Sequence, residues 1–358
     1  MTELAVAPPV LDSAALTATE PPERRGLGRD GVRLLVATPA GIWHRRFAEL
    51  ADILAPGDLL VVNDSATVAA EIDGMRRAGP VVVHAATELD DGDWVVELRT
   101  APDGRHPVLD AEPGEMVDLP DAVALTLRAP YPRTRGRPGR PRTRLWRAQV
   151  HGDHLRTALE HHGRPIAYGY LAGRFPLADY QTVFGVWPGS AEMASAARPF
   201  TPALVTRLVA AGIPIATVTL HTGVSSQEYD EPPQAERFAV GEATARLVNA
   251  TRTGGGRVIA VGTTVTRALE SATDGDGRVI TAAGWTNRVV TPDHPPRVVD
   301  GLVTGWHDPE ASHLQLVRAV AGDTLTRRAY AAAYAERYRW HEFGDSGLLL
   351  PGRPGRPG

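Results

Sequence analysis

Three polar clusters directly follow apolar runs in this sequence, and their residue types suit acid–base chemistry on a polar or anionic ligand. The clusters are Asn63, Asp64 and Ser65 after residues 59–62, His221 after residues 215–220, and Gly262, Thr263 and Thr264 after residues 257–261. An imidazole titrates near neutrality, and the N-terminus of a helix attracts a carboxylate or phosphate. Ligands of open α/β sheets bind beyond the carboxyl ends of strands. If these ends are neighbours in one sheet, we expect them to line one pocket.

Further candidates for chemistry stand in two polar segments. His307 lies in Gly-Trp-His-Asp-Pro-Glu before a helical pattern and is a second candidate acid or base. Tyr180 and Gln181 offer an aromatic ring and an amide, which suit recognition of a nucleobase. Each feature also has an ordinary interpretation: a histidine at a strand end, a threonine that caps a helix, or the start of a strand or helix.

Composition excludes several classes of chemistry. The chain of 358 residues has no cysteine, and reading its sequence shows that all 38 basic residues are arginine, with a net charge of -4. Disulfides, thiolate nucleophiles, cysteine-bound zinc and lysine Schiff bases are therefore excluded. The pairs His151/His154 and His161/His162 lack a coherent zinc spacing, so no metal site is expected. The sequence has no signal-peptide pattern and no membrane-length apolar run, which predicts a cytoplasmic protein that does not enter the membrane.

The elements that must position these residues follow two different sequence patterns. Residues 26–71 and 151–350 show apolar strands that alternate with amphipathic helices, which predicts an α/β domain. Residues 72–150 carry short alternating segments separated by Gly, Pro and Asp, which is typical of a small antiparallel barrel or sandwich. Residues 1–25 are expected to be a flexible lead and residues 351–358 a disordered tail.

An arginine-rich run lies within residues 72–150, the segment with the barrel or sandwich pattern. Residues 133–147 contain seven arginines and no acidic residue, so they are expected to form an exposed or disordered loop. Such a loop can follow nucleic-acid phosphates, or it can be only a solvated insertion. The candidate phosphate contacts in it are Arg135, Arg137, Arg140, Arg142 and Arg144.

The order of the motifs and their residues resemble those of the S-adenosylmethionine:tRNA ribosyltransferase-isomerase family of queuosine biosynthesis. The similarity spans about residues 28–350. Its main segments are residues 57–65 (GDLLVVNDS), 179–184 (DYQTVF), 218–223 (VTLHTG), 257–264 (RVIAVGTT) with Arg267 and Glu270, and 304–310 (TGWHDPE).

The resemblance implies an α/β domain interrupted by an inserted antiparallel β-barrel. It also implies that the ribosyl part of S-adenosylmethionine is transferred to an aminomethyl-deazaguanine in tRNA and isomerised, with release of adenine and methionine. On this basis His221, His307 and Asp64 are the candidate catalytic residues. The expected contacts of S-adenosylmethionine are Asn63, Ser65, Tyr180, Gln181, Gly262, Thr263, Thr264 and Arg267.

Some positions depart from the family pattern. Ala66 and Glu71 stand where the family has arginines, and Pro199 replaces a histidine, whereas Arg198 beside it is a candidate RNA contact. These departures leave two alternatives open: an S-adenosylmethionine enzyme with a small-molecule acceptor or water, and a non-catalytic RNA-binding protein on the same scaffold. The sequence is compatible with a monomer or a homodimer.

Overall fold

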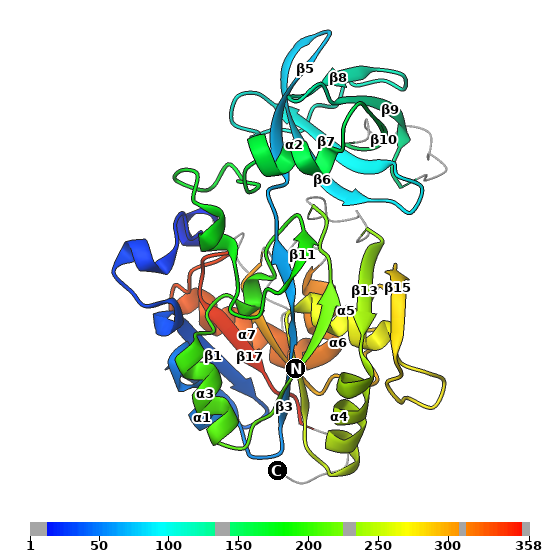
Figure 1. The fold of residues 1–358 in the computed structure, drawn as a ribbon. Coiled ribbons are helices and arrows are strands. Elements are labelled where there is room, and N and C mark those ends of the chain that lie inside the picture. Colours follow the sequence, from blue (N-terminus) through cyan, green and yellow to red (C-terminus); the bar gives the residue numbers. More distant parts are fainter. Residues whose placement is uncertain (1–12, 133–143, 225–233, 308–312, 353–358) are drawn as a thin grey trace, which may run out of the picture.

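The protein has two parts, a large sheet flanked by helices and a barrel that stands beyond one edge of that sheet (Figure 1). The computed structural model describes residues 13–132, 144–224, 234–307 and 313–352. This architecture confirms the predicted α/β fold with an inserted antiparallel barrel.

Nine strands form the large sheet, in the order β15-β13-β12-β3-β14-β16-β17-β1-β2. The four central strands, β12, β3, β14 and β16, are parallel to their neighbours among the four. The strand bounds are β1 Arg33–Thr38, β2 Gly41–Arg46, β3 Leu59–Asn63, β12 Ile215–Leu220, β13 Glu236–Val240, β14 Val258–Val261, β15 Ala282–Thr286, β16 Gly301–Gly305 and β17 Ser346–Leu349.

The sheet is covered on both faces, and strand β3 shows this because all five of its residues are buried. Leu59 and Val61 pack into a core with one set of helices, and Leu60 and Val62 pack into a second core on the opposite face, as the period of two in a strand requires. The first set is α4 Glu242–Thr253, α5 Thr263–Ser271, α6 His313–Ala321 and α7 Asp323–Ala335, and the second is α1 Leu50–Ile53 and α3 Pro202–Ala210.

Six antiparallel strands close the barrel, in the order β10-β7-β6-β5-β8-β9. Two chain segments connect it to the sheet, and they pair with each other through the short parallel strands β4 Ser65–Thr67 and β11 Trp187–Ser190. The barrel strands are β5 Glu71–Arg76, β6 Gly79–Glu88, β7 Trp94–Thr100, β8 Met116–Asp118, β9 Ala124–Pro130 and β10 Leu145–His151.

Helix α2 Leu155–His162 lies on the barrel rather than on the sheet (Figure 1). Its residues Leu155, Ala158 and Leu159 are buried in the barrel core. The sequence assigned everything after residue 150 to the α/β domain. That boundary was too early, because one face of α2 is apolar and covers the barrel.

Two further expectations need correction. The lead was expected to be flexible up to residue 25, but Leu16 and Ala18 are buried, and Ala18 N donates a hydrogen bond to Trp340 O at 3.0 Å. The arginine-rich run was expected to be a loop up to residue 147. Strand β10 begins at Leu145, because Leu145 and Trp146 are apolar and almost fully buried in the barrel. In the part of the chain that is described, no helix combines the length and apolar character needed to span a bilayer.

Candidate active site

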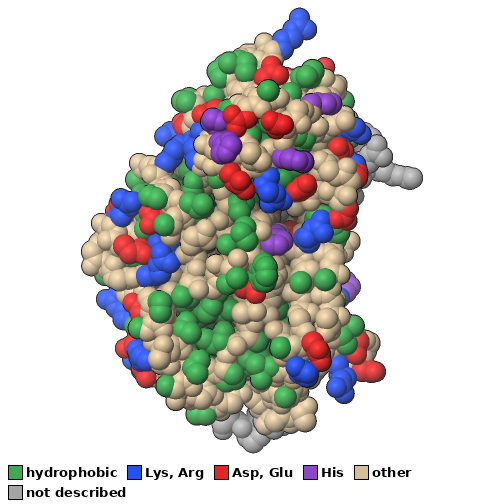
Figure 2. Space-filling view, in the orientation of Figure 1, with side chains coloured by type: hydrophobic (Ala, Val, Ile, Leu, Met, Phe, Trp, Pro, Cys, Tyr) green, Lys and Arg blue, Asp and Glu red, His purple; other side chains and the backbone are tan. Residues whose placement is uncertain are grey.

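The three polar strand ends meet at one edge of the large sheet. Asn63 at the end of β3 pairs with Val218 of the parallel strand β12. Strand β14 lies on the other side of β3 and is also parallel to it. The carboxyl ends of β3, β12 and β14 are therefore neighbours, as the sequence predicted. The barrel stands beyond this same edge, and Figure 2 shows histidine side chains extending over the barrel toward the junction with the larger part.

Asn63 connects two of these ends. Its side-chain nitrogen donates to Leu220 O at 2.8 Å, and its side-chain oxygen accepts from Leu220 N at 3.0 Å and from Ser65 N at 3.1 Å. The side chain has no exposed surface. Asn63 was expected to contact the substrate. Its amide positions Ser65 and the end of β12, and its side-chain nitrogen also lies 3.5 Å from Thr264 Oγ1 in the first turn of α5.

His221 is held by a short chain of hydroxyl groups. Its Nδ1 lies 2.7 Å from Ser65 Oγ, and that hydroxyl lies 2.6 Å from Ser190 Oγ. Ser190 Oγ also accepts a hydrogen bond from Thr222 N at 3.1 Å. Hydrogen bonding at one ring nitrogen fixes the orientation of the imidazole and leaves Nε2 as the nitrogen that can exchange a proton with a substrate.

The approach of this ring to β11 requires glycine at one position. A Cβ on Gly189 would lie 2.6 Å from Nδ1 of His221 and 2.8 Å from its Cε1. No side chain larger than hydrogen therefore fits while the imidazole keeps its place. The glycine sets the position of His221 as directly as the hydroxyl groups do.

Burial and charge keep His221 in its neutral form. Partial burial is the largest cause that lowers its pKa below the usual value, and Arg237 lowers it further. Asp64 acts in the opposite direction and raises it. Asp64 is itself almost buried, and Thr219 Oγ1 donates to its Oδ1 at 2.7 Å. A neutral imidazole beside a fixed carboxylate is a competent general base near neutral pH.

The first turn of α5 presents free donors at the same edge. Gly262 precedes the helix with φ of +98°, a left-handed conformation that favours glycine. Among the described residues, no side chain caps the helix through a hydrogen bond. Thr263 and Thr264 are partly exposed in this first turn. The backbone N–H groups and the two hydroxyls can therefore receive a carboxylate.

His307 follows β16, the next parallel strand after β14. Its ring stacks on His313 with centroids 4.6 Å apart. Burial lowers the pKa of His307 well below its usual value, and burial lowers that of His313 to about 4. Both rings are thus neutral, and His313 is a neighbour that the sequence analysis did not single out.

The sequence analysis also missed two glutamates, Glu192 and Glu342. Burial raises the pKa of Glu342 to about 8, with a smaller contribution from the negative charge of Glu192. Glu192 accepts a hydrogen bond from the buried Tyr168 hydroxyl, and its backbone oxygen accepts one from Thr222 Oγ1 at 2.6 Å. Because Glu192 and Glu342 are 150 positions apart, no local motif indicates that they interact.

Three residues expected to contact S-adenosylmethionine have partners within the protein. Arg267 is nearly buried and bonds to Glu236 and to several backbone oxygens. Gln181 pairs through its amide with both backbone groups of Thr67. Tyr180 is 3% exposed and packs on Phe343, its backbone oxygen accepts a hydrogen bond from Thr67 Oγ1 at 2.9 Å, and its hydroxyl has no hydrogen-bond partner among the described residues.

The arginines expected to contact RNA divide into two groups. Arg198 is 2% exposed, and its guanidinium bonds to Glu23 at 3.0 Å and to Asp179 O at 2.8 Å, so this side chain does not present a charge to phosphates. Arg144 is 7% exposed and lies 3.0 Å from Glu97. The other four, Arg135, Arg137, Arg140 and Arg142, lie outside the described residues.

The fold defines an α/β protein with a parallel centre to its mixed sheet and with an inserted barrel beyond the carboxyl ends of those central strands. The sequence profile of the queuosine biosynthesis protein family matches residues 12–349. The chain therefore belongs to this family.

Individual relatives agree over almost the whole chain. The chain is 34% identical over 349 residues to the S-adenosylmethionine:tRNA ribosyltransferase-isomerase of Acidiphilium cryptum, covering 92% of this chain and 96% of the relative. It is 35% identical to the enzyme of that name from Synechococcus elongatus, with 95% and 93% covered. The crystal structure of the S-adenosylmethionine tRNA ribosyltransferase of Thermotoga maritima is similar with a TM-score of 0.50 and 27% identity, over 94% of this chain and 97% of that one.

Proposed function

We propose that this protein transfers the ribosyl part of S-adenosylmethionine to 7-aminomethyl-7-deazaguanine in tRNA and isomerises it to epoxyqueuosine. Adenine and methionine are released. One observation supports this proposal above all. Neutral His221, the buried carboxylate of Asp64 and the uncapped N-terminus of α5 lie at the same edge of the sheet. The names of the relatives supply the substrates for this site.

His221 is the residue that we assign as the base. The positive sulfur of S-adenosylmethionine acidifies the C5′ hydrogens, so a neutral imidazole can remove one of them. Nδ1 is engaged with Ser65, and no described residue hydrogen-bonds Nε2. Asp64 stabilises the imidazolium that forms, since its charge raises the pKa of His221. These steps need no metal ion.

The first turn of α5 is the proposed site for the methionine carboxylate. Free N–H groups and the positive end of the helix dipole favour an anion there. Gly262 allows close approach of the ligand, while Thr263 and Thr264 offer hydroxyl donors. In this proposal Asn63 and Arg267 act as positioning residues, because their side chains bond to neighbouring strands.

Glu342 is the proposed proton donor for the leaving adenine. A leaving purine nitrogen needs a proton, and a carboxyl group with a pKa of about 8 carries one at neutral pH. Glu192 and Tyr168 hold this side of the site together through their hydrogen bond. His341 N donates a hydrogen bond to Trp306 O at 3.0 Å, so the residue before Glu342 contacts the residue before His307.

The acceptor is the second part of the proposal. The relatives are named for action on tRNA, and a tRNA substrate is consistent with a cytoplasmic reaction. We propose that the barrel, whose insertion we extend from residue 72 through α2, faces the tRNA. The arginine-rich run joins β9 to β10 of that barrel and is the proposed segment for phosphate contacts.

Product release tests the whole proposal. Purified protein is incubated with S-adenosylmethionine alone, with tRNA that carries the aminomethyl-deazaguanine, and with the same tRNA that carries guanine. Chromatography should show adenine and methionine only with the modified tRNA. Release without that tRNA would instead indicate a small-molecule acceptor or water. Salt-sensitive tRNA binding without any release would indicate a binding protein.

A further inference from the structure

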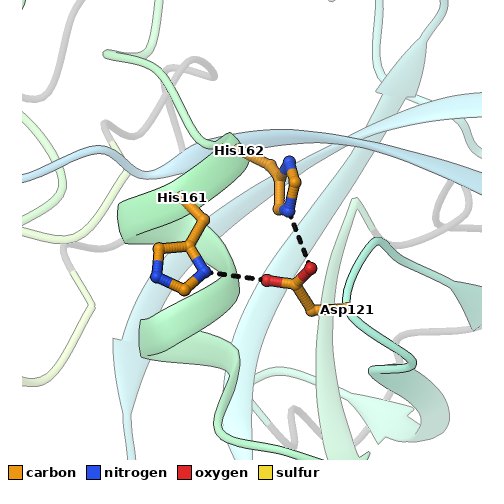
Figure 3. Close-up of side chains that lie close together, drawn as sticks. All are labelled: Asp121, His161 and His162. Carbon is orange, nitrogen blue, oxygen red and sulfur yellow. Dashed lines mark hydrogen bonds and ion pairs between the residues drawn. The ribbon is translucent and has the colours of Figure 1, made fainter.

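Two consecutive histidines and an aspartate about 40 positions earlier in the sequence converge on the surface of the barrel (Figure 3). His161 and His162 are the last two residues of α2, and Asp121 lies in the turn between β8 and β9. His161 Nδ1 lies 3.0 Å from one carboxylate oxygen of Asp121, and His162 Nε2 lies 2.8 Å from the other. One ligand atom from each residue lies within 4.8 Å of the other two.

The arrangement depends on an uncommon use of two consecutive helical residues. Neighbouring side chains of an α-helix diverge by about 100° and do not normally reach one point. Here His161 uses Nδ1 and His162 uses Nε2, and their rings stand at 85° to each other, so both nitrogens face the same carboxylate. An ordinary surface ion pair needs only one of these histidines.

The carboxylate is presented by a constrained turn. Asp121 and Ala122 have φ of 57° and 55°, in the left-handed region that is unfavourable for residues other than glycine. Backbone strain of this kind persists only where surrounding structure maintains it. The opposite side is also anchored, because Leu155, Ala158 and Leu159 fix α2 on the barrel core.

Charge and chemistry favour a cation at this point. The C-terminal end of a helix carries a partial negative charge, which favours a cation beside His161 and His162 at the end of α2. Two imidazole nitrogens and one carboxylate oxygen match the ligands of a borderline divalent ion, and Zn²⁺ binds such sets with water in the fourth position. The side chains are exposed enough for an ion and its water to enter.

The geometry points to a binding site for a divalent cation of the zinc class, formed by His161 Nδ1, His162 Nε2 and one oxygen of Asp121. When the ion binds, each imidazole is neutral and carries its single proton on the nitrogen that is not a ligand, so the two hydrogen bonds to the carboxylate are exchanged for bonds to the ion. It connects the end of α2 to the β8–β9 turn. This site is separate from the proposed ribosyl-transfer chemistry and does not depend on it.

Calorimetric titration of the full chain with ZnCl₂, after removal of metals by chelation, tests the proposal. We expect one site, with affinity reduced at least tenfold in each of His161→Ala, His162→Ala and Asp121→Asn. His106→Ala is the matched control, because His106 is an exposed histidine of the same barrel outside the cluster, and it should bind Zn²⁺ like the parent.

Thermal unfolding gives a second readout. Zn²⁺ in excess should raise the Tm of the parent and of His106→Ala by a few degrees and leave the three cluster variants unchanged. All variants should unfold at the parent temperature in chelator, because the replaced side chains are exposed. Binding that survives both histidine replacements, or binding only at millimolar Zn²⁺, would overturn the proposal.

Discussion

The strand-end site and the base of the barrel both bury polar groups, but they satisfy them in opposite ways. At the strand ends, His221 is held by hydroxyl groups and stays neutral. At the barrel base, Glu71 has no exposed surface and bonds to His84 at 3.0 Å, Arg164 at 2.6 Å and Arg174. These partners lower the pKa of Glu71 to about 2.

The difference separates a group that can exchange protons from one that cannot. A carboxylate surrounded by cations keeps its charge throughout the physiological range and contributes to structure. An imidazole or carboxyl group that burial holds near its uncharged form can take up or release a proton during a reaction. Both regions show strongly perturbed groups, so perturbation alone does not identify a catalytic site. What distinguishes the two regions is the cause of the pKa shift: charged partners keep Glu71 ionised, whereas burial favours the uncharged form of His221.

Replacement of His221 by alanine should have the largest effect on activity. Loss of the proposed base lowers kcat/KM for adenine release by about 100-fold to 10,000-fold. Because the side chain is only half-buried, thermal unfolding should change little. His106→Ala is the control and should retain parent kinetics. Full turnover in His221→Ala would move the base to another residue, with His307 the next candidate.

Replacement of Glu71 by leucine should affect stability rather than chemistry. The change leaves the buried His84 without its hydrogen-bond partner, while Arg164 keeps its pair with Asp73, which costs about 1–3 kcal/mol of unfolding free energy. Urea denaturation measures this cost. Glu242→Gln breaks an exposed pair with Arg246 at 3.0 Å and should cost less than about 0.5 kcal/mol. Equal effects of the two variants would contradict the structural role of the barrel network.

Acid unfolding provides a check on the same network. The pKa of Glu71 is depressed in the folded state, so its stabilisation is fully present above the unfolded value near 4.5 and is lost as the pH falls toward 2. The parent should lose stability steeply over this interval, and Glu71→Leu should show a shallower dependence. A parallel dependence in both proteins would remove Glu71 from the acid transition.

Replacement of Gly189 by alanine should give an intermediate loss. A Cβ at this position meets the His221 ring at 2.6 Å, so the ring or β11 must shift. A displaced base lowers kcat by roughly 10-fold to 100-fold, because catalysis depends on small changes of geometry. Gly92→Ala is a useful comparison for a turn glycine with positive φ and no neighbour within 4 Å. Parent kinetics in Gly189→Ala would show that the imidazole position is not critical.

The smallest effect should appear in the pH dependence. Burial and Arg237 lower the pKa of His221 below 6.5, and the neutral form is the proposed base. The acidic limb of the parent's pH profile should therefore lie at lower pH than that of an ordinary imidazole, with a tenfold fall per pH unit once protonation dominates. Replacing Arg237 with glutamine should move this limb to higher pH. An unchanged limb would separate His221 from the titration.

The sequence alone could predict the strand ends, because apolar runs that stop at polar residues mark buried parallel strands. It could not predict which side chains were already occupied. Asn63 bonds to Leu220, 157 positions away, and Arg198 bonds to Glu23, 175 positions away. The same limit applies to Asp121 and His161, which no local spacing connects. Residue type indicates possible chemistry, whereas availability depends on long-range contacts.

The two segments that connect barrel and sheet are joined to each other at two levels. Glu71 and Arg164 form a backbone bridge, and β4 pairs with β11 just below it. Ser65 belongs to β4 and Ser190 to β11, and these are the hydroxyls that hold His221. A twist of the barrel against the sheet must shear this pair of strands. The position of the imidazole is therefore coupled to the orientation of the barrel, so the proposed docking of tRNA on the barrel would shift the proposed base.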